Sequence, residues 1–204
     1  MDVSRPFAAL APGVDSDVLV ALAGSTAQRS GREIARLSGR SPTGVQHALD
    51  RLVEEGLVHR SQAGRAYLYS LNHEHLLAPA VEVMADARWE LMRRLRDLFA
   101  GWKSPILHAS LFGSVARGEG NAASDIDLLV VRPRGIDVED EQWRSQLEEL
   151  ADQVLRWTGN QAGIAELSED DVSAPAGRSP IFEEIADEAI DLAGLPLRRL
   201  MKKL

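Results

Sequence analysis

The sequence predicts an α+β chain with two small domains joined by one long helix. Residues 1–75 hold three helix patterns followed by a hairpin pattern, and residues 76–103 form an amphipathic stretch. Residues 104–204 alternate apolar strand patterns with helix patterns, which predicts a small mixed sheet with helices. A chain of 204 residues is long enough for two separate cores of this kind.

Three helices are expected in the N-terminal domain. Asp15-Ser16-Asp17 is predicted to cap the first, which runs through Leu22, and residues 32–37 form the second. Ser41-Pro42 supplies an N-cap and a first-turn proline for the third. The apolar stripe of this third helix predicts its buried side, and four residues are left pointing outward: Thr43, Gln46, His47 and Asp50.

A β-hairpin follows, with residues 58–60 and 66–71 joined by residues 61–65 and Gly64 at the turn. Three helices and a hairpin in this order resemble the winged helix-turn-helix DNA-binding domains of bacterial regulators of the MarR and ArsR type. The resemblance implies duplex DNA as a partner and transcription regulation as the role, with the third helix in the major groove and the hairpin along the backbone. The residues expected to contact DNA are Thr43, Gln46, His47, Arg51 and Arg65.

Charge is distributed in a way that fits DNA binding. Residues 27–65 contain seven arginines and four acidic residues, a local excess of +3, whereas the whole chain carries −8. A small basic face on an otherwise acidic protein favours a localised polyanion contact. The alternative is a protein-interaction module, because folds of this kind also occur without DNA binding.

Residues 76–103 are predicted to form a single linking helix with a heptad seam interrupted by one arginine. The seam residues are Leu77, Val81, Met84, Arg88, Leu91, Leu95, Leu98 and Trp102. Such a seam can pair two chains, which predicts a homodimer, or it can pack on the C-terminal domain of its own chain. The sequence does not choose between these alternatives.

The most specific pattern lies in residues 106–131. A strand ending at Phe112 turns at Gly113-Ser114 into a short helix, whose first backbone N–H groups are free to receive phosphate oxygens. A second strand begins at Asp125, and Asp125 and Asp127 share one of its faces about 6.6 Å apart. Two carboxylates this close favour a bound cation, and Mg²⁺ suits hard oxygen ligands and substrate phosphates. Either half alone is also typical of an ordinary strand-to-helix turn.

These residues resemble the minimal nucleotidyltransferase domains of the DNA polymerase beta superfamily. The resemblance rests on Gly113-Ser114, Arg117-Gly118 and Ser124-Asp125-Ile126-Asp127-Leu128, and it extends over roughly residues 104 to 195. It implies that Gly113, Ser114, Arg117 and Ser124 bind ATP or another nucleoside triphosphate, and that Asp125 and Asp127 are catalytic residues that bind Mg²⁺.

A third acidic residue is usual on the next strand of catalysing members, and the sequence departs from the family here. That strand is expected at residues 161–167, where Gly163 stands near the expected position and Glu166 is the only carboxylate. Glu166 is therefore the candidate third catalytic residue. A regular strand turns it to the opposite side from Gly163, so it reaches the site only through a bulge and is otherwise a solvent-facing glutamate.

Two functional classes follow from these motifs. One is a DNA-binding regulator whose C-terminal domain binds nucleoside triphosphate and Mg²⁺ as a sensor. The other is an active nucleotidyltransferase, and the resemblance also allows an antitoxin that modifies a partner toxin protein. The chain has no cysteine, and we expect neither a signal peptide nor a membrane span, so a cytoplasmic protein is expected.

Overall fold

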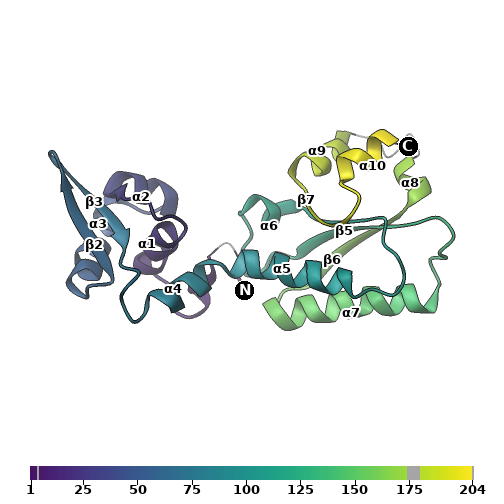
Figure 1. Ribbon diagram of the computed structural model, residues 1–204, viewed down its shortest axis with the longest axis horizontal. Coiled ribbons are helices and arrows are strands. Elements are labelled where there is room, and N and C mark those ends of the chain that lie inside the picture. Colours follow the sequence, from purple (N-terminus) through teal and green to yellow (C-terminus); the bar gives the residue numbers. More distant parts are fainter. Residues whose placement is uncertain (4, 174–179, 204) are drawn as a thin grey trace. The chain divides into compact units, whose positions relative to one another are not determined.

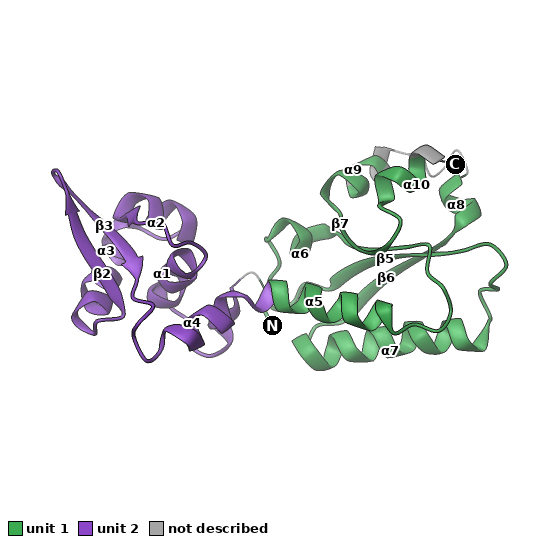
Figure 2. Ribbon diagram, in the orientation of Figure 1, with its two compact units in different colours: residues 1–4, 89–204 green, residues 5–88 purple. Residues whose placement is uncertain are grey.

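The computed structural model describes residues 1–3, 5–173 and 180–203, and these residues fall into two compact units. Figure 2 shows the units in different colours: unit 1 comprises residues 1–4 and 89–204, and unit 2 comprises residues 5–88. Unit 1 thus includes the first residues of the chain as well as its C-terminal half. The predicted α+β class is confirmed, since both units combine helices with a sheet.

Unit 2 is built from short helices around one apolar core. A 3-10 turn η1 (Pro6–Ala9) precedes α1 (Val14–Ala23), α2 (Gly31–Ser38) and α3 (Pro42–Glu54). The third helix begins as the sequence predicts, because the Ser41 side chain accepts a hydrogen bond from the backbone N–H of Gly44 at 3.2 Å. Thr43, Gln46, His47 and Asp50 are exposed, also as predicted.

The expected cap of the first helix was wrong. The N-cap is Gly13, which makes no side-chain cap hydrogen bond, and Asp15, Ser16 and Asp17 lie inside the helix. Asp17 is instead buried and joins two arginines, with Oδ2 at 2.9 Å from Arg5 and 2.6 Å from Arg40. Packing explains the difference from the expected cap, because the observed helix buries Val18 and Leu22 in the core of unit 2.

The hairpin of unit 2 is tighter than expected. Strands β2 (Val58–Ala63) and β3 (Ala66–Leu71) pair up to Ala63 and Ala66, so only Gly64 and Arg65 form the turn. Gly64 has a φ of +62°, the conformation that a two-residue hairpin turn requires. A third short strand, β1 (Arg29–Ser30), adds to the outer side of β3.

The expected single linking helix is two helices, α4 (Ala78–Ala85) and α5 (Ala87–Ala100), with Asp86 outside helical geometry between them. The first part of the predicted seam packs in unit 2, through Val81 and Met84. From Leu91 onward it packs in unit 1, where Leu91 and Leu95 are buried in the core. These side chains of α5 are used within their own chain, so they are not free to pair two chains.

Unit 1 contains a four-stranded mixed sheet in the order β6-β5-β4-β7. The central strands β4 (His108–Leu111) and β5 (Ile126–Arg132) are antiparallel, and β7 (Ile190–Gly194) is antiparallel to β4. Only β6 (Ala162–Ser168) runs parallel to its neighbour, and its register places Gly163 opposite Asp127. The parallel pair is connected by α7 (Glu141–Thr158), which provides the crossover that parallel strands need.

Helices cover both faces of this sheet (Figure 1). On one face α5 and α7 enclose the larger core, which includes Met92, Trp143 and Leu150. On the other lie α8 (Glu169–Ser173), α9 (Pro180–Glu188) and α10 (Leu197–Lys203), which pack on Leu129 and Val131. The short helix α6 (Gly113–Arg117) begins directly after β4. Within the described ranges, no helix is both long and apolar enough to cross a bilayer.

Candidate functional site

Asp125 and Asp127 lie at the start of β5, on the face that carries Leu129 and Val131. A Cβ built on Gly163 of the neighbouring strand would lie 3.8 Å from Asp125 Cβ and 2.9 Å from Asp127 Oδ1. Both aspartates therefore lie beside Gly163 on one face, as the alternation of side chains along a strand requires. Asp125 is exposed and Asp127 is half-buried.

The local electrostatics disfavour negative charge on Asp127. Burial raises the pKa of this carboxyl above its usual range, and the charges of Asp125 and Glu188 raise the pKa further. The guanidinium of Arg117 acts in the opposite direction but does not cancel the shift. A cation at this position would relieve the repulsion, so the carboxylate pair fits a metal such as Mg²⁺.

Gly113 approaches the Asp127 carboxylate so closely that only glycine fits. Its φ is +70°, and a Cβ added there would overlap Asp127 Oδ2. The two segments are held together by the backbone, because the N–H of Phe112 donates to the carbonyl of Asp127 at 3.0 Å. The strand end thus brings the Gly113-Ser114 turn against the Asp127 carboxylate.

Two of the other expected nucleotide-binding residues belong to α6. Among the described residues, the hydroxyl of Ser114 has no hydrogen-bond partner. Arg117 is exposed and paired, since its Nε donates to Glu119 at 2.9 Å and its Nη1 donates to Glu188 at 2.5 Å. These two carboxylates raise the pKa of Arg117, so the guanidinium stays charged.

Glu188, at the end of α9, is a site residue that the sequence reasoning missed. Its Oε1 accepts the backbone N–H of Gly113 at 2.9 Å, and its Oε2 accepts Arg117. The hydrogen bond from Arg117 holds the pKa of Glu188 below its usual range, assisted by the Gly113 N–H. No local signal marks this residue, because it is one of several acidic residues in an amphipathic helix far along the chain.

Ser124 is fixed by hydrogen bonds within the turn that precedes β5. Its Oγ accepts the backbone N–H of Asn121 at 3.0 Å. Its carbonyl accepts the side-chain amide of Asn160 at 2.8 Å, and Asn160 is itself buried. Asn160 is thus a second residue that the sequence reasoning missed, and it fixes the turn from which Asp125 projects. The available signal was its place directly after Gly159, the left-handed end of α7.

Glu166 does not reach the carboxylate pair. Its Oε1 accepts hydrogen bonds from Arg132 Nε and from the indole Nε1 of Trp143, each at 2.9 Å. The strand is regular here and no bulge turns the side chain round, since β5 and β6 keep one register throughout. Glu166, the candidate third catalytic carboxylate, is therefore a structural residue that holds α7 to the sheet. It is neither turned into the site by a bulge nor simply a solvent-facing glutamate.

In unit 2 the five residues expected to contact DNA fall into two groups. Thr43, Gln46 and His47 are exposed on α3, and Arg65 is exposed at the hairpin turn. Gln46 makes hydrogen bonds to Asp50 at 2.9 Å and to the Tyr69 hydroxyl at 3.3 Å. Arg51 differs from the others, because it is paired with Asp15 of α1.

Comparison with known proteins locates one domain in the chain. No curated protein matches the sequence. Residues 92–167 match the family model described as a nucleotidyltransferase domain. The matched range runs from α5 through β6 and includes the Gly113-Ser114 turn, Asp125 and Asp127, while Glu188 lies beyond it. This part of the chain is therefore similar to nucleotidyltransferase domains.

Proposed function

We propose that this protein is a DNA-binding regulator whose nucleotidyltransferase domain binds a nucleoside triphosphate with Mg²⁺, and that it transfers the nucleotidyl group, with release of pyrophosphate, slowly or not at all. The observation that carries the proposal is Gly163, which faces Asp125 and Asp127 where a third carboxylate would complete a catalytic site. Without that group, one metal ligand and an activator of the attacking hydroxyl are missing.

The residues at the site fit a metal–triphosphate ligand. Asp125 and Asp127 would hold Mg²⁺, and the rest of its coordination would come from phosphate oxygens and water. In agreement with this, the described part of the chain contains no cluster of three or more potential metal-binding side chains. When bound, the metal neutralises phosphate charge. The Gly113 N–H, the Ser114 hydroxyl and the Arg117 guanidinium are the donors that would bind the phosphates, and in this structure Glu188 accepts hydrogen bonds from the first and the last of them.

Turnover distinguishes this proposal from the alternative, an active transferase such as an adenylyl-transferring antitoxin. We expect calorimetry to detect Mg-ATP or Mg-GTP binding, and radiolabelled α-phosphate to remain untransferred to protein. Glu166→Gln should leave nucleotide affinity unchanged, because Glu166 binds Arg132 and Trp143 instead of the site. Rapid labelling by the wild type, lost in Glu166→Gln, would establish the transferase and overturn the sensor function.

The fold of unit 2 supports the DNA-binding half of the proposal. Its three helices and hairpin follow the order of a winged helix, in which the third helix, here α3, would read the DNA. A groove of about 640 Å³ lies between α2, α3 and the hairpin. Its lining includes Arg32, Gln46 and Arg65 and no acidic residue. Among the described residues neither arginine has an ion-pair partner, so both charges are available to phosphates.

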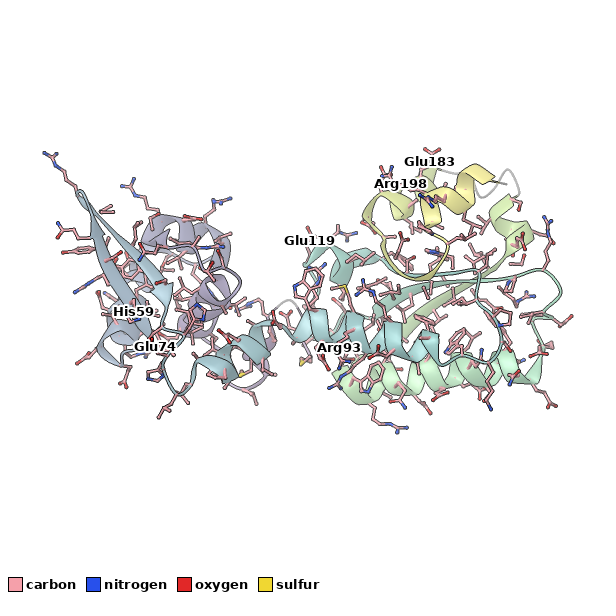
Figure 3. The ribbon with its side chains drawn as sticks, viewed as in Figure 1. His59, Glu74, Arg93, Glu119, Glu183 and Arg198 are labelled. Atoms are coloured by element: carbon pink, nitrogen blue, oxygen red, sulfur yellow. The ribbon has the colours of Figure 1, made fainter. Side chains whose placement is uncertain are left out.

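Arg65→Ala should reduce the salt dependence of duplex binding. Each phosphate contact contributes a slope of about −0.9 in log K against log salt, so losing one contact makes the slope shallower by about one unit. Fluorescence anisotropy with a duplex enriched by genomic selection would measure it. The control is Arg93→Ala, which removes the same charge from α5 of unit 1 and should leave the slope unchanged; Arg93 is labelled in Figure 3. Equal slopes for the wild type and Arg65→Ala would show that Arg65 in the hairpin turn makes no phosphate contact.

A further inference from the structure

Glu188 occupies the two donors that a triphosphate would need. Its carboxylate accepts the Gly113 N–H at 2.9 Å with one oxygen and Arg117 Nη1 at 2.5 Å with the other. We propose that Glu188 is an in-chain ligand of the nucleotide site, and that the triphosphate binds by displacing it. This inference rests on the proposed function, because it concerns control of the same site.

Competition follows from the chemistry of the donors. A single backbone N–H makes one strong hydrogen bond, so Gly113 serves either Glu188 or a phosphate oxygen at one time. Arg117 gives its Nε to Glu119 and one N–H of Nη1 to Glu188, and its other N–H groups remain for a phosphate, so the competition is sharpest at Gly113. Glu188 also places a negative charge at the same two donors. A triphosphate therefore meets an occupied Gly113 N–H, a partly occupied Arg117 and a local charge that repels it.

The position of Glu188 in the fold allows the exchange. It is the last residue of α9, and its side chain is 20% exposed. Two residues later Ile190 pairs with Leu111 of β4, so the backbone on this side is fixed by the sheet. Rotation of the glutamate side chain into solvent is sufficient to free both donors, and no strand of the sheet has to separate.

Displacement lowers the apparent affinity for the nucleotide. Only molecules with Glu188 rotated away bind the phosphates fully, so the measured dissociation constant equals the intrinsic one divided by the fraction of open molecules. Removing the charge of Glu188 weakens its hold on Gly113 and Arg117, and raises that fraction. A ligand without phosphates does not need these donors and gains nothing from the change.

Calorimetric titration of three full-length proteins with Mg-ATP tests the exchange: the wild type, Glu188→Gln and Glu183→Gln. The control removes the same charge from an exposed position of the same helix, and Figure 3 shows Glu183 on α9. Losing the charge of one hydrogen-bonded carboxylate should tighten Mg-ATP binding by about fivefold in Glu188→Gln. Glu183→Gln should match the wild type, and adenosine should show no difference among the three proteins.

Hydrogen exchange at the Gly113 amide gives an independent readout. Without nucleotide, this amide should exchange faster in Glu188→Gln than in the wild type, and a similar melting temperature would show that the fold is kept. Weaker or equal Mg-ATP binding by Glu188→Gln, with binding by the wild type retained, overturns the displacement and makes Glu188 a supporting residue. If no protein of the set binds Mg-ATP, the proposed nucleotide function fails, and this inference fails with it.

Discussion

Replacing Asp125 and Asp127 together by asparagine is expected to abolish Mg²⁺-dependent nucleotide binding while leaving the protein folded. These are the two carboxylates available for the metal, and both lie beside Gly163. Since loss of even an outer-shell partner of a metal typically costs about 10- to 100-fold in affinity, removing both carboxylates should weaken binding by more than about 100-fold. Calorimetry with Mg-ATP measures the effect.

The same variant should not lose stability in metal-free buffer. The Asp127 carboxyl, whose pKa is raised in the folded state, binds protons more tightly there than in the unfolded chain. Its contribution to the free energy of unfolding therefore falls as the pH rises above the ordinary pKa of 3.8. Asparagine removes this unfavourable charge. The melting temperature of the wild type should therefore fall more steeply with pH in this range than that of the double variant.

A matched pair of charge removals elsewhere controls for net charge. Glu148→Gln with Asp152→Asn changes two exposed residues of α7 and should leave Mg-ATP affinity as it is. Unchanged affinity in the Asp125→Asn, Asp127→Asn protein would show that the nucleotide binds without these carboxylates, and the assignment of the metal site would be lost.

Gly113→Ala is the second substitution with a large expected effect, because it strains the backbone at position 113 and displaces the Asp127 carboxylate. An L-residue at a φ of +70° costs about 1–2 kcal/mol of stability. The new methyl group would also overlap Asp127 Oδ2 and force this carboxylate to rotate. We expect Mg-ATP affinity to fall by more than about tenfold, since a misplaced ligand costs as much as a lost outer-shell partner.

Gly135→Ala separates these two effects. Gly135 has a φ of +89°, and a Cβ there would have no atom within 4 Å. Urea unfolding should show a similar loss of stability for both alanine variants, whereas calorimetry should show weaker Mg-ATP binding for Gly113→Ala alone. Equal nucleotide affinity in the two variants would mean that the contact between Gly113 and Asp127 is not needed for binding.

The strands of the sheet in unit 1 could be predicted from local pattern. Their apolar runs are bounded by turn residues, so the expected strands at 106–112 and 125–131 correspond to His108–Leu111 and Ile126–Arg132. The strand expected at 161–167 corresponds to Ala162–Ser168. Side-chain alternation then suffices to put Asp125 and Asp127 on one face, because that property depends on the strand alone.

Features decided by tertiary packing could not be predicted in this way. The break at Asp86 has no glycine or proline to mark it, and it separates a helix whose apolar side packs in unit 2 from one that packs in unit 1. The partners of Glu166 lie on a different strand and on α7, and Gly113 and Glu188 are 75 positions apart. Such contacts depend on how elements distant in sequence meet.

The order of the strands in the sheet has a consequence for synthesis on the ribosome. β4 lies between β5 and β7, and its second neighbour, β7, is the last strand of the sheet to be made. Until residues 190–194 emerge, one edge of a strand that is buried in the finished fold is left unpaired on the nascent chain, where it can join other chains. The segment that closes this edge also brings Glu188 to Gly113 and Arg117. The sheet is thus completed, and the hydrogen-bond donors of the phosphate site are covered, in the same late step of folding.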